Sequence, residues 1–377
     1  MTSDVIIVGG GIIGCSTGLR LAQAGLKVTL LERGRVGGEA THAAAGMLTP
    51  QTGADRPDPF FDLCLRSRAM YPAFVDEMRE LSAIDPQYRG EGSIFLSLDD
   101  RDEALIDGWA TWQSEAGLSL ERLTAERIKG LEPSVTDSVR GGVLVPGDHQ
   151  VDNRLLINAV RTSALRAGVE IVEGKQADAL LIAQDRVSGV ACREEIYTAG
   201  CVVVAAGCWS SALLETAGLS IPVTPARGQM VAVKGDVVPI RFLVHSTKCY
   251  LVPRLDGRIL IGATVEYAGF RKAVTTEGIR SLLDAGVEIV PELDRFEIVE
   301  TWSGLRPDTP DHLPVIGPAG PDGLILATGH FRNGILLAPI TAQLISDTII
   351  KGQLPDEFRP FGADRFKDKK PEARIKK

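Results

Sequence analysis

The stretch Val5-Ile6-Ile7-Val8-Gly9-Gly10-Gly11-Ile12-Ile13-Gly14 decides the fold of this chain. An uninterrupted apolar run that ends at glycines is typical of a strand buried on both faces of a parallel sheet. Beyond Gly14, apolar residues recur at helical spacing until Gly25, which is a common helix stop. A second apolar run, 28–31, then ends at Glu32. The sequence therefore predicts a strand, a glycine turn, a helix and a second parallel strand.

Each glycine of the turn has a separate predicted role. Gly9 makes the tight turn, Gly11 allows a pyrophosphate to approach the backbone, and Gly14 lets the helix pack closely on the strand. The phosphates would then lie on backbone N–H groups at the positive end of the helix dipole. Glu32 lies near the spacing of roughly 20 residues expected of an acid that accepts hydrogen bonds from ribose hydroxyls. Together these features favour binding of an adenine dinucleotide over a purely structural turn.

Length and composition limit the class of protein. The chain has 377 residues, more than the roughly 250–300 that one hydrophobic core usually serves, so we expect two domains. The net charge of -8 gives no general attraction to nucleic acid or to an anionic membrane. The six cysteines have no zinc-type spacing, so we expect buried thiols and no metal site. The sequence lacks a membrane span and a basic leader segment, so we expect a cytoplasmic protein.

Later segments repeat or complete the first motif. The run 201–207 is predicted to be a central parallel strand that returns to the first sheet. Asp256-Gly257 predicts a type I′ hairpin between extended runs. Near the end, strand 324–327 is followed by a turn over 329–334 and a helix over 335–350. A helix N-terminus placed there would stabilise negative charge on a reduced flavin.

Small residues are dense after Glu32, where the sequence reads Ala40-Thr41-His42-Ala43-Ala44-Ala45-Gly46-Met47. Such residues let the backbone run close to a flat ligand or to another backbone. On the residues alone, a ligand-contacting loop and a tightly packed structural loop are equally favoured.

Five stretches together resemble the D-amino acid oxidase family of flavin-dependent enzymes, and within it the glycine oxidases of thiamine biosynthesis. The resemblance covers nearly the whole chain, from Asp4 to about Phe366. Its carriers are the unit Gly9 to Glu32, the segment 41–48, Cys249-Tyr250, Trp302-Ser303-Gly304-Leu305-Arg306-Pro307, and Gly329-His330-Phe331-Arg332-Asn333-Gly334-Ile335-Leu336-Leu337.

The resemblance implies FAD as the cofactor. The FAD is expected to be non-covalent, because no cysteine follows Cys249, whereas related sarcosine oxidases attach their flavin through a cysteine in the later segment. The residues implied to bind FAD come from the glycine turn, the end of the second strand, the small-residue loop, the position Ala177 that matches an adenine contact, the end of the central strand, and the turn over 329–334 with the two residues after it. They are Gly9, Gly11, Ile12, Ile13, Gly14, Glu32, Arg33, Ala40, Thr41, Ala45, Gly46, Met47, Ala177, Gly207, His330, Phe331, Arg332, Asn333, Gly334, Ile335 and Leu336.

Three residues match the family's substrate-binding and catalytic positions. Arg306 matches the residue that pairs with the substrate carboxylate, and a guanidinium suits this anion because it offers two parallel charge-assisted bonds. Tyr250 matches the tyrosine whose hydroxyl helps hold that carboxylate. Arg332 matches a second residue that contacts the substrate. On the residues alone, a surface ion pair of Arg306 with Asp308 or Asp311 is the simpler interpretation.

The implied reaction is the oxidation of glycine or another small amine. Once the carboxylate is fixed, the substrate Cα–H points at flavin N5, and such positioning supplies much of the rate. Hydride transfer gives an imine, which water hydrolyses to the oxo acid, glyoxylate from glycine, and ammonia. Dioxygen takes the electrons and yields hydrogen peroxide. The resemblance also implies a thiazole synthase as a partner that takes the imine, and a homo-oligomer.

Three alternatives stay open at this point. The first alternative is a D-amino acid or sarcosine oxidase, because Lys248 and Val265 stand where glycine oxidases have a histidine and a methionine. The second is a dehydrogenase that passes electrons to a quinone. The third is a non-catalytic flavin-binding module, which Arg306 and Tyr250 disfavour because such a module needs no carboxylate clamp.

The expected fold class is α/β, with a Rossmann-like FAD-binding domain around a parallel sheet and a substrate domain with a mainly antiparallel sheet. The chain is expected to alternate between the two domains. The FAD-binding domain takes 1–88, 140–220 and 305–366, the substrate domain takes 89–139 and 221–304, and a polar tail takes 367–377.

Overall fold

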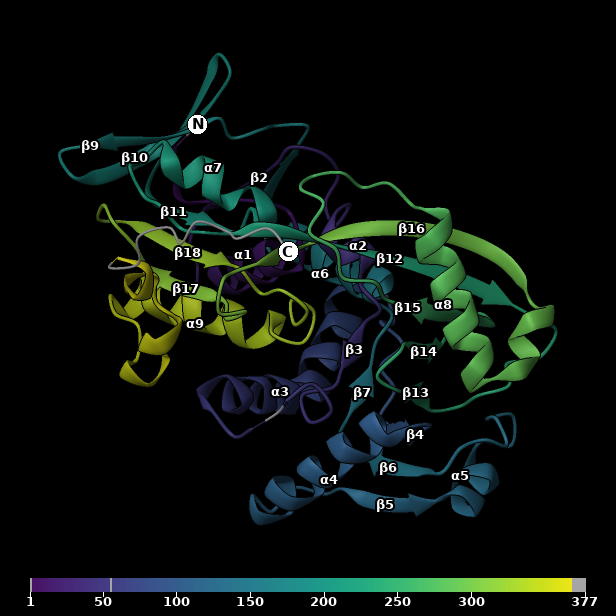
Figure 1. Ribbon diagram of the computed structural model, residues 1–377. Helices are drawn as coiled ribbons and strands as arrows, with labels where there is room; N and C mark the ends of the chain where they lie inside the picture. Colours follow the sequence, from purple (N-terminus) through teal and green to yellow (C-terminus); the bar gives the residue numbers. More distant parts are fainter. Residues whose placement is uncertain (1, 55, 368–377) are drawn as a thin grey trace. The chain divides into compact units, whose positions relative to one another are not determined.

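The computed structural model describes residues 2–54 and 56–367, and the chain divides into two compact units. Unit 1 consists of Met1–Gly38, Ile157–Pro225 and Arg306–Lys377, and unit 2 of Glu39–Leu156 and Ala226–Leu305. Each unit is built on its own large sheet (Figure 1). The predicted α/β fold, with one parallel and one mainly antiparallel sheet, is confirmed.

The main path of the sheet of unit 1 is parallel except at one edge. Its strands follow the order β17 (Val315–Pro318), β18 (Leu324–Thr328), β11 (Glu195–Val204), β1 (Thr2–Val8), β2 (Val28–Glu32) and β8 (Glu170–Glu173). Only β17 runs antiparallel to its neighbour in this path. A hairpin of β9 (Ala179–Ala183) and β10 (Arg186–Cys192) extends the sheet from β11. The strand that leads into the glycine turn, β1, is thus a central strand of a parallel sheet, as the sequence predicts.

Two long helices of unit 1, α1 (Ile12–Gln23) and α9 (Ala338–Lys351), pack against each other. α1 begins directly after the glycine turn. The predicted helix start at Ile335 is wrong, because residues 331–337 form turns and Pro339, which suits a first helical turn, sets the start at Ala338. The other helices are α6 (Asn153–Arg166, shared with unit 2), α7 (Ser210–Glu215), and the 3₁₀ helices η1 (Gly207–Trp209), η3 (Asp356–Phe361) and η4 (Ala363–Phe366).

The sheet of unit 2 is almost entirely antiparallel. Its order is β16 (Glu297–Asp308), β12 (Thr224–Lys234), β15 (Arg258–Gly262), β14 (Tyr250–Pro253), β13 (Leu243–His245), β4 (Ser93–Ser97), β6 (Gly141–Val145) and β5 (Glu121–Thr124). The β13–β4 pair is parallel. A separate two-stranded sheet joins β3 (Met47–Leu48) to β7 (His149–Gln150).

Helices cover the sheet of unit 2. α8 (Thr276–Ile289) lies across the sheet, with Leu282 packed in one core with Leu251 and Ile261 (Figure 1). Thr275 caps this helix, because its Oγ1 accepts the Gly278 N–H at 3.1 Å. The remaining helices are α2 (Ala40–Ala43), α3 (Pro59–Ser82), α4 (Asp100–Glu115), α5 (Ala125–Leu131) and the 3₁₀ helix η2 (Pro291–Arg295).

The hairpin between β14 and β15 differs from its prediction in turn type. A type I′ turn needs positive φ at both central residues, but here only Gly257 has one, at 89°. The Gly257 N–H donates to the Arg254 carbonyl at 3.1 Å, so a three-residue loop ends in a left-handed glycine. The Asp256 carboxylate accepts the Arg258 N–H at 3.1 Å, and this local bond favours the observed turn.

The predicted domain segments and the compact units have different boundaries. Residues 39–88 and 140–156 belong to unit 2, whereas both were expected in the FAD-binding domain. A compact unit does not by itself say which residues hold a cofactor, so the domain assignment stays a prediction. Of the predicted tail 367–377, residues 368–377 lie outside the described residues.

Asp148 gives a testable pH dependence of stability. Its buried carboxylate accepts hydrogen bonds from Thr52 Oγ1 at 2.8 Å and Ser93 Oγ at 3.0 Å, and burial raises its pKa to about 6. The native state therefore binds this proton more tightly than the unfolded chain, so the contribution of Asp148 to stability falls as pH rises from about 4 to about 6. Relative to Asp148→Asn, the natural protein is expected to be more stable at pH 4 than at pH 7, by about 2–3 kcal/mol. Urea unfolding of both proteins at the two pH values measures this, and an equal difference at both would contradict it.

Candidate functional site

The predicted cofactor residues of unit 1 meet at one edge of its sheet. The register aligns the last residues of β1, β2, β11 and β18, which all run parallel. Gly9, Gly207 and His330 lie in the segments that follow three of these strands, and Glu32 is the last residue of β2. The chain leads from β1 to β2 on one side, while β11 lies on the other, so this edge is a topological switch point. Parallel α/β sheets bind ligands at such points.

The glycine turn is closely packed against neighbouring backbone. Gly9 has φ 112°, and a Cβ there would lie 2.3 Å from the Ala205 carbonyl oxygen. A Cβ on Gly14 would lie 1.9 Å from the Gly9 carbonyl oxygen. Gly11 is the N-cap of α1, and no side chain of the described residues caps this helix. The first turn of α1, with Ile12 and Ile13, is therefore held against the strand. The N–H groups and the dipole at this helix N-terminus suit a diphosphate.

Glu32 has a second role that the sequence analysis missed. Its Oε2 accepts the Gly10 N–H and its Oε1 the Gly34 N–H, both at 2.7 Å. A carboxylate offers about four acceptor positions, so these two bonds leave capacity for ribose hydroxyls. Glu32 thus joins the glycine turn to the loop after β2, and these bonds are compatible with the predicted ribose contact, which stays a prediction.

A stacked pair lies at the same edge. The Arg33 guanidinium lies over the Trp209 ring, 3.4 Å from its centroid. Trp209 was not predicted as a site residue, although an aromatic residue two positions after Gly207, in the segment that follows a central strand, was a usable signal. Ala177, in the segment between β8 and β9, is half-buried against the neighbouring core.

The last turn of unit 1 is conformationally restricted. Phe331 has φ 44°, which is unusual for a non-glycine residue and common at functional sites. Its N–H donates to the Pro307 carbonyl at 2.9 Å, and the His312 ring stacks on its ring at 4.9 Å. The segment that carries Arg332 therefore lies beside the segment that carries Arg306. In unit 1, the two predicted substrate arginines therefore lie on neighbouring segments of the chain.

His330 supports this turn from inside. It is buried, its Nε2 hydrogen bonds with Thr341 Oγ1 at 3.1 Å, and burial lowers its pKa to about 3, so the ring is neutral. The Asn333 N–H donates to the His330 carbonyl at 2.9 Å. The predicted residues Gly334, Ile335 and Leu336 continue the turn toward α9, and the last two are buried.

Unit 2 contains the other predicted residues. Ala40 and Thr41 begin α2, Ala45 and Gly46 follow it, and Met47 starts β3. Gly46 has φ 69°, and a Cβ there would lie 2.0 Å from the Val151 carbonyl oxygen. The small residues of this segment therefore allow close packing against another backbone, one of the two interpretations that the sequence left open.

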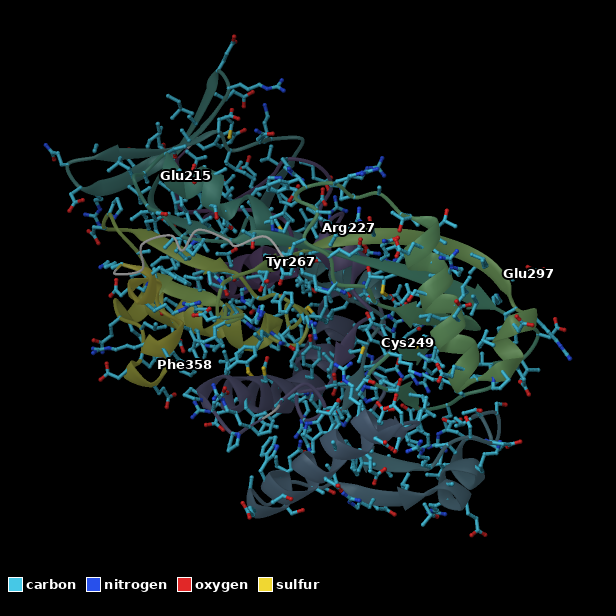
Figure 2. The ribbon with its side chains drawn as sticks, viewed as in Figure 1. Glu215, Arg227, Cys249, Tyr267, Glu297 and Phe358 are labelled. Carbon is cyan, nitrogen blue, oxygen red and sulfur yellow. The ribbon has the colours of Figure 1, made fainter. Side chains whose placement is uncertain are left out.

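Tyr250 begins β14, directly after Cys249, which is labelled in Figure 2. The Tyr250 hydroxyl lies 3.3 Å from Met230 Sδ, and the ring is half-buried. Lys248 is exposed and pairs with Glu288 at 2.5 Å, and Val265 is also exposed. The predicted site residues are thus divided: Arg306 and Arg332 belong to unit 1, and Tyr250 to unit 2.

Two further properties bear on function. Within residues 2–54 and 56–367, no group of three or more His, Cys, Asp or Glu side chains is arranged to hold a metal ion. In the same part of the chain, no helix has the length and apolarity needed to cross a membrane.

Residues 4–348 match the family model of the DAO type, described as FAD dependent oxidoreductase. The chain belongs to this family of FAD-dependent oxidoreductases. The predicted cofactor, FAD, and the predicted kinship with the D-amino acid oxidase family are confirmed. The glycine turn, the α1 N-terminus and Glu32 fit the diphosphate and ribose of this cofactor. The residue-by-residue assignment of the site stays a prediction.

Named relatives narrow the family. Glycine oxidase of Pseudomonas aeruginosa is 37% identical over 359 residues, 94% of this chain and 96% of that protein. The bifunctional protein ThiO/ThiG of Synechocystis sp. is 37% identical over 97% of this chain, but the chain spans only 54% of that relative, about half its length. The crystal structure of glycine oxidase from Geobacillus kaustophilus matches with a TM-score of 0.92 and 33% identity, over 96% of this chain and 98% of that one.

Proposed function

We propose that this FAD-dependent oxidoreductase is a glycine oxidase that also accepts other small amines, such as sarcosine and small D-amino acids. The observation that carries the proposal is the pair of predicted substrate arginines, Arg306 and Arg332, on neighbouring segments at the cofactor edge of unit 1. Likeness over almost the whole length of a relative named glycine oxidase supports it.

The proposed roles follow from the chemistry of the side chains. The half-buried Arg306 guanidinium binds the substrate carboxylate through two parallel charge-assisted bonds. Arg332 adds positive charge from the neighbouring turn, and the Tyr250 hydroxyl donates to the same carboxylate. Holding the carboxylate fixes the direction of the substrate Cα–H bond, and this positioning supplies much of the rate. Bound FAD supplies the hydride acceptor, whose electrons pass to dioxygen and yield hydrogen peroxide.

The product of the proposed reaction points to a partner enzyme that would use it. The oxidised substrate is an imine, which water hydrolyses to glyoxylate and ammonia when glycine is the substrate. A relative that carries both ThiO and ThiG in one chain supports a link to a thiazole synthase, which would use the imine in thiamine biosynthesis. We further propose a cytoplasmic location, which agrees with six cysteines that form no disulfide in the described residues, and a homo-oligomer.

Anaerobic reduction of the purified yellow protein tests the proposal. Glycine and sarcosine are each expected to bleach the flavin absorbance, and air is expected to restore it with formation of hydrogen peroxide, because the clamp accepts a small amino acid and dioxygen is the acceptor. Bleaching by D-alanine alone would instead make the enzyme a D-amino acid oxidase. Bleaching without recovery in air would make it a dehydrogenase, and no bleaching by any of the three would contradict amine oxidation.

A further inference from the structure

Arg254 is an almost fully buried arginine outside the predicted site, at the end of strand β14. We propose that Arg254, with Asn153, is a positioning residue that holds the backbone of segment 41–47 in the conformation that receives the flavin. The inference rests on the proposed contact between this segment and the cofactor. It assigns the geometry of the segment to two side chains that are distant in the sequence.

The guanidinium of Arg254 makes hydrogen bonds to two backbone segments at once. Its Nη2 donates to the Ala45 carbonyl at 2.8 Å, and its Nη1 donates to the Val151 carbonyl at 2.7 Å. Its Nη2 also donates to Asn153 Oδ1 at 3.0 Å. A planar fork with five donors can hold several acceptors in fixed directions, which a lysine cannot do.

Asn153 extends this support to the start of the segment. Its Nδ2 donates to the Thr41 carbonyl at 2.8 Å and to the His42 carbonyl at 3.2 Å. Because Asn153 Oδ1 accepts a hydrogen bond from Arg254, the Asn153 Nδ2 group points toward segment 41–47. The two side chains thus form one connected cluster.

Neighbouring contacts show how closely the segment is held. The Val151 N–H donates to the Gly46 carbonyl at 2.9 Å, and the Gly46 Cα lies too close to the Val151 carbonyl for a side chain. Trp302 Nε1 donates to the Ala43 carbonyl at 3.1 Å. Side chains from two other parts of unit 2 therefore satisfy the carbonyls of residues 41–43 and 45. A short helix such as α2 cannot supply these bonds itself.

The charge of Arg254 is poorly compensated, which argues against a purely stabilising role. Burial lowers the pKa of its guanidinium to about 10, and among the described carboxylates only Asp152 is recorded as its ion-pair partner, with Oδ2 4.0 Å from Nε. Burying a charge is costly, and well-packed apolar residues often stabilise a core as well or better. What Arg254 provides instead is fixed geometry at the Ala45 and Val151 carbonyls.

Arg254→Lys tests the proposal, because it keeps the charge and removes the fork. Apoprotein of this variant is expected to bind FAD at least tenfold more weakly, with shifted visible flavin bands and faster proteolytic cleavage within 39–53. Arg258→Lys is the matched control on the next strand, where the half-buried arginine pairs with Asp256 and Glu300. This control is expected to stay within twofold of the natural protein in FAD affinity, with an unchanged spectrum.

Asn153→Ala keeps the test decisive if Arg254→Lys does not fold. It removes only the bonds to Thr41, His42 and Arg254, and a smaller loss of FAD affinity with the same spectral shift is expected. Natural FAD affinity and spectrum in the variant that folds would overturn the proposal. If the natural protein does not oxidise glycine while Arg254→Lys loses FAD, the proposed function fails and the positioning role stands.

Discussion

Replacing Arg306 by Leu is expected to lower kcat/KM for glycine by about three orders of magnitude while FAD stays bound. Removing one partner of a buried, hydrogen-bonded charge pair typically costs about 2–5 kcal/mol, and about 1.4 kcal/mol corresponds to a tenfold change. Arg306 is half-buried beside the turn that carries Arg332, so its pairing with a carboxylate is only partly screened by water. Both KM and kcat should change, because the same bonds bind the substrate and orient its Cα–H.

The measurement compares oxygen consumption with glycine and with methylamine, which lacks the carboxylate. The natural enzyme is expected to prefer glycine strongly, and Arg306→Leu should lose most of this preference. Arg359→Leu is the control, since Arg359 is an exposed residue of unit 1 that pairs only with Asp356 among the ion pairs recorded for the described residues. An unchanged preference for glycine in Arg306→Leu would show that another group binds the carboxylate.

The sequence was sufficient to predict the first strand, the glycine turn and the parallel sheet of unit 1, because their signals are local. An apolar strand, a glycine turn and a helix lie within about two dozen residues, and Gly9 and Gly14 are each required by one close backbone contact. The positions of Gly207, shortly after β11, and of the turn after β18 then follow from the parallel topology, since parallel strands place their carboxyl ends at one edge.

The contacts that the sequence could not predict join distant residues. Arg254 and Ala45 are 209 residues apart in the chain, so no local pattern links them. The stack of Arg33 on Trp209 is also long-range. The late start of α9 and the turn at Gly257 are local, but in each case one residue, Pro339 or Asp256, outweighed the general pattern. Burial of Arg254 was not expected, because arginine is usually exposed.

Gly14→Ala is expected to weaken FAD binding at least a hundredfold and to destabilise the apoprotein by about 1–3 kcal/mol, as overpacking does. The new Cβ would lie 1.9 Å from the Gly9 carbonyl oxygen and 3.2 Å from its carbon, and neither backbone atom can rotate away. Gly14 has ordinary helical conformation within α1, where alanine is favoured by about 1 kcal/mol, so backbone strain does not explain the loss. The N-terminus of α1 must instead move away from the glycine turn, and its N–H groups then no longer match the diphosphate.

Gly18→Ala, one turn later in α1, separates this contact from general effects on the helix. A Cβ there would lie 3.4 Å from Ile7 Cδ1 and 3.6 Å from Val169 Cγ1, which are ordinary van der Waals distances to flexible side chains. This variant is expected to keep natural FAD affinity and to gain up to about 1 kcal/mol in stability. Quenching of flavin fluorescence by apoprotein and urea unfolding measure both quantities. If Gly14→Ala binds FAD as tightly as Gly18→Ala, the close approach of α1 to Gly9 does not create the diphosphate site, and the glycines of the turn serve only the packing of helix on strand.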